Sequence, residues 1–75
     1  MPALDPVLKR FGANVRTQRE ARNFSQERLA ELADLDRTYI GGIERGERNL
    51  GLLNVVRVAK ALKTSVAGLC AGIDR

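Results

Sequence analysis

The chain has 75 residues, a single cysteine, no histidine and a formal net charge of +4. One cysteine excludes an internal disulfide, and the lack of histidine excludes a structural zinc site and Ser–His or Cys–His catalysis. A chain this short forms one small domain whose core alone leaves a net stability of only a few kcal/mol. We therefore expect support from a second subunit. We expect no metal, no cofactor, no small-molecule substrate and no enzymatic activity.

The apolar residues do not form a membrane or export segment. No apolar run approaches the roughly 18 residues that a spanning helix needs. Met1–Pro6 lacks the apolar stretch of a signal peptide. We therefore expect a cytoplasmic protein in a reducing compartment.

The positive charge is carried mainly by arginine, which supplies 10 of the 13 basic residues. A guanidinium group suits bidentate pairing with phosphate and with guanine edges. The charge therefore favours a nucleic acid as the partner.

Helical periodicity runs through most of the chain, and no stretch alternates as a strand does. The first helix is expected to start after Pro6 and to run to about Arg22, with an apolar stripe formed by Leu8, Phe11 and Val15. The same stripe continues onto Arg19. A charge in line with core positions needs a carboxylate partner from elsewhere in the fold.

A tight turn separates two short helices in the middle of the chain. Ser25 is a suitable N-cap for the first of them, which should end near Asp34. Aspartate tolerates the left-handed conformation that such a turn demands. The expected apolar face of this helix consists of Leu29, Leu32 and Ala33.

The next helix should run from its N-cap Asp36 to about Arg45, with Gly46 just past its end. Ile40, Ile43 and Glu44 share one side, so Glu44 is the carboxylate that Arg19 requires. The opposite side carries Thr38, Gly42 and Arg45. Gly41-Gly42 lowers the stability of this helix by about 1 kcal/mol per glycine relative to alanine. The spacing of the two isoleucines and the signals at both helix ends nevertheless support a helix.

Two more helices complete the chain. The clearest periodicity extends from Gly51 to about Lys63 and places on one face Leu52, Val55, Val56, Ala59 and Leu62. Ser65 then caps a short last helix whose apolar residues are Val66, Leu69, Cys70 and Ile73. A terminal helix of a small domain has little core to cover so many apolar side chains, which indicates a surface that a second chain covers.

Two helices of about ten residues joined by a tight turn are typical of the helix-turn-helix motif. Gln26 to Arg45, QERLAELADLDRTYIGGIER, resembles this motif in the phage-repressor-like, or Cro/C1-type, family, and the similarity extends from Phe11 to Leu69. It is carried by Gln26, Leu29, Ala30, Ala33, Leu35, Ile40, Ile43, Glu44, Gly46, Ala59, Ala61, Leu62 and Leu69.

The resemblance implies an all-α, five-helix phage-repressor-like domain that spans residues 1–75. The helix-turn-helix would occupy about 25–45 and a C-terminal dimerisation helix about 65–73. The pairing of Arg19 with Glu44 resembles the ion pair that ties the first helix of this family to the end of its third.

Within the family, DRTYI at residues 36–40, GIER at 42–45 and Arg48-Asn49 resemble the controller proteins of restriction–modification systems. These are small dimeric activators and repressors that time expression of the endonuclease after the methyltransferase. The chain departs from the family at Asp34 and Lys63, where glycine is usual, and at Gly51, where serine is commoner. Gly42 stands where phage repressors carry a long base-reading side chain, which moves that role to Arg37 and Thr38.

The resemblance also implies how DNA would be contacted, with the third helix entering the major groove by its N-terminus. The expected base-reading residues are Asp36, Arg37, Thr38 and Gly42, the last by letting the backbone approach the DNA closely. The expected phosphate contacts are Ser25, Gln26, Tyr39, Arg45, Arg48 and Asn49. The alternatives that stay open are Arg37 on a phosphate, Thr38 and Arg45 as solvated side chains, Tyr39 in packing, Ser25 as a cap alone and Gly42 as a neutral surface site.

One domain would read about four or five base pairs, too few for tight binding at cellular salt. We therefore expect a homodimer on a pseudo-palindromic operator in double-stranded DNA, with RNA polymerase as a further partner. The expected dimer interface consists of Leu50, Leu53, Val66, Leu69, Cys70 and Ile73. The alternative functions are a phage-type repressor and an antitoxin or adaptor module that uses the same fold to bind protein.

Overall fold

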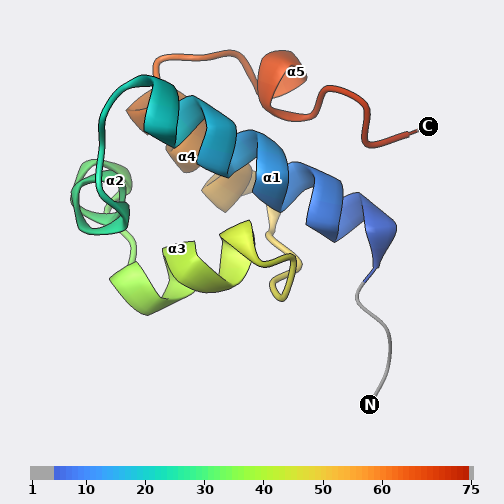
Figure 1. Cartoon of the computed structure of the whole chain (residues 1–75), viewed down its shortest axis with the longest axis horizontal. Helices are drawn as coiled ribbons and strands as arrows, with labels where there is room; N and C mark the ends of the chain where they lie inside the picture. Colours follow the sequence, from blue (N-terminus) through green and yellow to red (C-terminus); the bar gives the residue numbers. More distant parts are fainter. Residues whose placement is uncertain (1–4, 75) are drawn as a thin grey trace.

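Five helices make up most of the computed structural model, which describes residues 5–74. They are α1 (Pro6–Ala21), α2 (Gln26–Ala33), α3 (Arg37–Glu44), α4 (Leu52–Ala61) and α5 (Val66–Leu69). α1 lies between α3 and α5, and α4 lies behind it in Figure 1. The predicted all-α class is confirmed, since these residues contain no strand. Most of Met1–Pro6, which is predicted not to be a signal peptide, lies outside the described residues.

Side-chain caps explain where four of the helices begin. Each capping oxygen accepts a backbone N–H at no more than 3.0 Å, and the caps are Asp5, Ser25, Asp36 and Ser65. α4 starts at Gly51 without a side-chain cap, as the sequence predicts. None of the helices in residues 5–74 is long and apolar enough to cross a membrane.

Left-handed residues end three of the helices. Asp34 has φ 57°, Lys63 has φ 53° and Asn23 has φ 56°. The prediction that Asp34 adopts this conformation is confirmed, and it makes the tight turn between α2 and α3. Gly46, with φ 79°, reverses the chain after α3.

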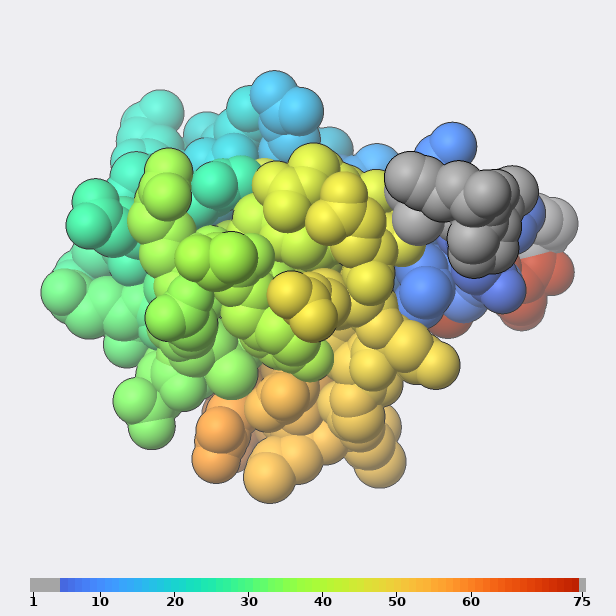
Figure 2. Space-filling model, turned by 90° about the horizontal axis from the view of Figure 1, so that it is seen from below, coloured from blue at the N-terminus to red at the C-terminus, as the bar shows by residue number. Residues whose placement is uncertain are grey.

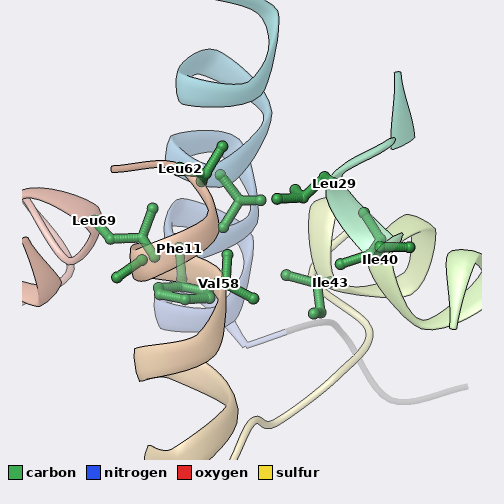
Figure 3. Packing of buried hydrophobic residues seen from close by; sticks show 10 residues of the cluster. Phe11, Leu29, Ile40, Ile43, Val58, Leu62 and Leu69 are labelled. Atoms are coloured by element: carbon green, nitrogen blue, oxygen red, sulfur yellow. The ribbon is translucent and has the colours of Figure 1, made fainter. Parts of the chain in front are cut away.

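One hydrophobic core joins all five helices, and its main side chains are shown in Figure 3. The buried side chains are Phe11, Val15, Leu29, Ala30, Ala33, Ile40, Ile43, Val58, Ala59, Leu62 and Leu69.

Two leucines that are predicted to lie on buried faces are exposed in the structure. Leu52 is 75% exposed because no neighbouring element covers the first turn of α4, while Val58, which the predicted face omitted, is fully buried. Leu32 is 42% exposed, because it stands about 100° around α2 from the centre of the buried stripe.

α1 and α3 come into backbone contact at Gly12, a feature that the periodicity did not reveal. A Cβ at Gly12 would lie 2.2 Å from the carbonyl oxygen of Ile43 and 2.8 Å from that of Glu44. Both of these atoms belong to the backbone of α3 and cannot move independently of the helix. Gly12 therefore sets how closely α1 lies against α3.

α5 is held by polar side chains of α1 as well as by apolar packing. Asn14 Nδ2 donates to the carbonyl oxygens of Leu69 at 2.9 Å and Ala71 at 2.8 Å. Arg10 Nε donates to the Ala71 oxygen at 3.3 Å. These bonds satisfy carbonyls at the end of α5, where a helix has no internal donors left.

We expect Gly12→Ala to lower the free energy of unfolding by about 2 kcal/mol, because overpacking against backbone outweighs the gain in helix propensity. Gly42→Ala is a matched control, since a Cβ there meets only the side chain of Arg48. That variant should keep or raise the stability by up to about 1 kcal/mol. Urea unfolding measures both, and equal stability of the two variants would contradict the close contact at Gly12.

Candidate nucleic-acid interface

Arg19 and Glu44 form an ion pair that joins three helices. Arg19 donates from Nε to Glu44 Oε2 at 2.7 Å and from Nη2 to Oε1 at 3.1 Å. Its Nη1 donates to the carbonyl oxygen of Phe24 at 2.8 Å, just before α2. Gln26, the first residue of α2, donates to Glu44 Oε1 at 3.0 Å. The two charged side chains are only 12% and 4% exposed.

The surroundings keep this pair charged. Hydrogen bonding to Glu44 raises the pKa of Arg19 above its usual value, and this exceeds the opposing effect of burial. Because every charged atom of Glu44 accepts a hydrogen bond, the pair is well satisfied despite its burial. It therefore fixes the end of α3 to both α1 and the start of α2.

The first turn of α3 presents polar side chains on the surface seen in Figure 2, where α3 is light green and the following segment is yellow. Arg37 and Thr38 are exposed. No carboxylate within residues 5–74 pairs with Arg37. Asp36 caps α3 by accepting the Thr38 N–H with its Oδ1 at 2.7 Å. Arg37 is thus held at a fixed helix start with its guanidinium unneutralised.

Gly42 does not offer open backbone, which corrects the expectation that DNA could approach it closely. The residue is buried, and a Cβ built on it would lie 3.0 Å from both Cγ and Nε of Arg48. A Cβ on Gly41 would lie 3.1 Å from Nη1 of Arg45. The surface in the middle of α3 is therefore formed by two arginines that follow the helix.

These two arginines are in different electrostatic states. Arg45 makes a two-pronged ion pair with Glu47, with distances of 2.9 Å and 3.1 Å. Hydrogen bonding from Arg45 lowers the pKa of the Glu47 carboxyl, and Glu47 raises that of Arg45. Nothing in the sequence pattern predicts Glu47 as the partner of Arg45. Arg48 instead lies with its Cζ 5.6 Å from the centre of the Tyr39 ring, a cation–π distance.

The remaining predicted phosphate contacts lie beside α3. Tyr39 is half-buried and its ring packs on the core, so the packing role is present while its hydroxyl remains a candidate contact. Ser25 is exposed and its oxygen accepts the Arg28 N–H at 3.0 Å, which leaves the hydroxyl hydrogen available to donate. Gln26 uses one amide hydrogen on Glu44, and Asn49 is exposed.

The residues predicted for the dimer interface differ in how far they are exposed. Leu69 is fully buried in the core and cannot contact a second chain, which corrects its assignment to the interface. Leu53 is 66% exposed. The other assigned residues are half-buried against the core: Leu50, Val66, Cys70 and Ile73.

A shallow groove of about 170 Å³ runs along this surface and is mainly apolar. Its lining includes Leu8, Phe11, Leu50, Val55, Cys70 and Ile73. Within residues 5–74 no cluster of His, Cys, Asp and Glu could hold a metal ion.

Comparison with known proteins identifies the family. The Helix-turn-helix family model matches residues 15–69. The control protein C.SmaI of Serratia marcescens is 55% identical over 56 residues, which are 75% of this chain and 67% of that protein. The chain belongs to the helix-turn-helix family of restriction–modification control proteins.

Solved structures of control proteins share the arrangement described above. The controller protein C.AhdI from Aeromonas hydrophila superposes with a TM-score of 0.81 at 47% identity, covering 83% of this chain and 94% of that one. The C.Esp1396I tetramer in complex with its natural 35 base-pair operator gives a TM-score of 0.75 at 37% identity, covering 79% of this chain and 78% of that one. The family resemblance predicted from the sequence is confirmed.

We expect Glu44→Gln to lower the free energy of unfolding by about 3 kcal/mol, because it leaves the buried Arg19 charge without its anion. Replacing both partners by apolar residues, Arg19→Met with Glu44→Leu, should recover much of that loss. Thermal and urea unfolding of the three proteins measure this. A loss below about 1 kcal/mol for Glu44→Gln would place the pair among weak surface ion pairs.

Proposed function

We propose that this protein is a sequence-specific DNA-binding transcription regulator, a restriction–modification controller that binds a pseudo-palindromic operator as a homodimer. The observation that carries the proposal is the first turn of α3, where Arg37 and Thr38 are exposed and the helix start is fixed by the Asp36 cap. The similarity to control proteins, one of them solved on its operator, supports the same function. It favours a controller over a phage repressor or an antitoxin.

The dimensions of α3 fit a DNA groove. Its eight residues span about 12 Å, close to the width of a major groove. In that position Arg37 would donate two hydrogen bonds to a guanine edge, and Thr38 would contact a neighbouring base. Asp36 holds the first turn of α3 in place and leaves Oδ2 to accept from a cytosine amino group.

Phosphate contacts on either side would fix the register of α3 in the groove. At the start of α2, the Ser25 hydroxyl and the backbone N–H groups near Gln26 form a site that favours an anion. On the other side, Arg48, Asn49 and the Tyr39 hydroxyl face the opposite strand. Arg45 contributes less charge, because Glu47 neutralises it.

A second copy of the chain would cover the apolar groove and Leu53. One protomer measures 30 × 25 × 22 Å, so two protomers side by side can place their α3 helices about 34 Å apart, one turn of DNA. Joining two copies also buries apolar surface that a domain of this size needs for stability. The dimer therefore meets a stability requirement and a geometric one together.

The proposal places the protein in the cytoplasm with the DNA and assigns it no enzymatic reaction and no cofactor, as befits a family of regulators. Activation from an operator would bring RNA polymerase into contact with the bound dimer.

We expect Arg37→Ala to weaken binding to the preferred duplex by about 1–3 kcal/mol and to relax base preference at one position, because a bidentate guanine contact is lost. The duplex is obtained by enrichment from a randomised pool with the wild-type protein, and affinities are measured by fluorescence anisotropy. Arg16→Ala is the charge-matched control, since Arg16 lies on α1 and pairs with Glu20 at 3.2 Å.

Wild-type affinity should also fall steeply and linearly with salt on logarithmic axes, as phosphate neutralisation requires. A flat salt response would contradict the proposed DNA binding through phosphate contacts. Equal losses for Arg37→Ala on preferred and scrambled duplexes would count against base reading by Arg37.

We expect Leu53→Lys to convert the dimer to a monomer, because it places a charge in the apolar contact between copies. Leu32→Lys is the control, since Leu32 is another exposed leucine but lies on α2, away from the groove. Sedimentation equilibrium without DNA compares the two with the wild type. A dimer that survives Leu53→Lys unchanged would place the interface elsewhere.

A further inference from the structure

One wall of the apolar groove comes from the end of the chain, where there is little helical structure. α5 lies beside α1 (Figure 1) and has only four residues, and the chain turns after it at Gly72, whose φ is 78°. The groove residues of this segment, Cys70 and Ile73, are half-buried. A helix of one turn has no stability of its own. Contacts with other elements must therefore fix where this wall stands.

Asn14 of α1 supplies polar contacts to this wall on both sides of Cys70. Its Nδ2 donates to the carbonyl oxygen of Leu69 at 2.9 Å and to that of Ala71 at 2.8 Å. A side-chain amide has two N–H groups, so both donors of Asn14 are used on this segment. The position and direction of the backbone at Cys70 are therefore set from α1.

Arg10, one helical turn before Asn14, contacts the same segment further along. Its Nε donates to the Ala71 oxygen at 3.3 Å. Its Nη2 and Nε lie 3.0 Å and 3.1 Å from the place where a Cβ of Gly72 would be, so the guanidinium packs against bare backbone. The two side chains together tie the chain to α1 up to the residue before Ile73.

The position of this wall matters for a contact between two copies related by a two-fold axis. In such a contact the same patch meets itself, so a projection on one copy must meet a recess on the other. In the proposed dimer the projection is Leu53, 66% exposed, and the recess is the groove of about 170 Å³. The gain from burying Leu53 depends on how closely the groove side chains surround it. A shift of Cys70 and Ile73 would widen the groove and lose those contacts.

We propose that Asn14 is a positioning residue for dimerisation, which shapes the groove that receives Leu53 of the partner subunit. Arg10 supports it from the preceding turn of α1. The inference rests on the homodimer of the proposed function and names the part of α1 that controls it. Apolar packing allows small shifts of a short helix, whereas hydrogen bonds to two carbonyls are directional. The polar contacts of α1 therefore determine the shape of an apolar surface.

The test measures the dissociation constant of the dimer without DNA, by sedimentation equilibrium over a range of protein concentrations. We expect Asn14→Ala to raise this constant about tenfold, because two hydrogen bonds no longer hold the groove wall. Asn14→Asp has the same size but no donor, and should raise it at least as much. Arg10→Ala keeps Asn14 and should raise it by a smaller factor.

Gln18→Ala is the matched control for Asn14→Ala. Gln18 is also a half-buried amide residue of α1, one turn further along, but its Oε1 accepts from Arg22 Nη1 at 2.8 Å at the end of the same helix. Its removal should leave the dissociation constant unchanged. An equal rise for Gln18→Ala would show that any truncation on α1 weakens the dimer, and would overturn the role of Asn14.

A double-variant comparison separates this role from a general loss of stability. If Asn14 acts through the groove, combining Asn14→Ala with Leu53→Ala raises the dissociation constant by less than the product of the two single rises. Independent effects that multiply would overturn the inference. Urea unfolding of Asn14→Ala in the Leu53→Lys monomer measures the effect on folding alone, and NMR of the same protein should show shift changes concentrated in residues 70–73.

Failure of the inference and failure of the proposed dimer are distinguishable. If the wild type stays monomeric, or if Leu53→Lys leaves the dimer intact, the proposed homodimer fails and the inference with it. If the wild type dimerises through Leu53 while Asn14→Ala and Arg10→Ala keep the wild-type dissociation constant, the dimer stands and the inference is overturned. Both results are independent of DNA binding.

Discussion

The buried ion pair between Arg19 and Glu44 is the interaction on which the arrangement of this domain depends. Helices of 8 residues have little stability alone, and α2 and α3 gain theirs from packing. Arg19 reaches the end of α3 through Glu44 and the entry to α2 through the Phe24 carbonyl. One side chain of α1 therefore fixes the orientation of both α2 and α3 relative to α1. A well-satisfied pair is directional in a way that apolar packing is not, which suits a motif whose function depends on orientation.

The surface of α3 is formed partly by its own side chains and partly by side chains of the segment that follows it. Its first turn carries side chains of its own, fixed by the Asp36 cap, whereas its middle is covered by arginines from the segment after the helix. The glycine pair lowers helix stability but allows these arginines to lie close to the helix axis. Ile40 and Ile43, both buried in the core, compensate by anchoring the opposite side of α3. Packing thus outweighs propensity at this helix, which is why a sequence with two central glycines is helical at all.

Much of this fold could be predicted from the sequence, because caps, left-handed turn residues and apolar spacing are local signals. They located all five helices and the role of Asp34. They failed where the outcome depends on what a neighbouring element covers. Leu52 is predicted to be buried but is exposed, and Val58 is buried although the predicted face omits it, because the core does not reach the first turn of α4. Leu69 shares the apolar face of the last helix with Val66 and Cys70, so spacing alone predicts one surface for all three, whereas Leu69 is fully buried and the other two are only partly covered.

The candidate site shows the same division. The exposed positions of Arg37 and Thr38 and the pairing of Arg19 with Glu44 could be predicted from helical position and charge. The covering of Gly42 by Arg48 and the neutralisation of Arg45 by Glu47 could not, because both depend on the chain reversal at Gly46. Gly12 had no signal in periodicity, since a glycine that permits backbone contact looks the same in sequence as one on an open surface.

α1 also connects the two ends of the molecule. In its first half and middle, Arg10 and Asn14 hold carbonyls at the end of α5, and near its end Arg19 holds α3. One helix of about 24 Å therefore joins the proposed subunit contact to the proposed base-reading surface. In a dimer built this way the separation of the two reading helices is a property of the folded protomer, with no flexible linker to adjust it. Such a dimer would accept only one spacing between its two half-sites. An operator with one base pair inserted at its centre would present the second half-site about 3.4 Å further along and rotated about 35° around the DNA axis.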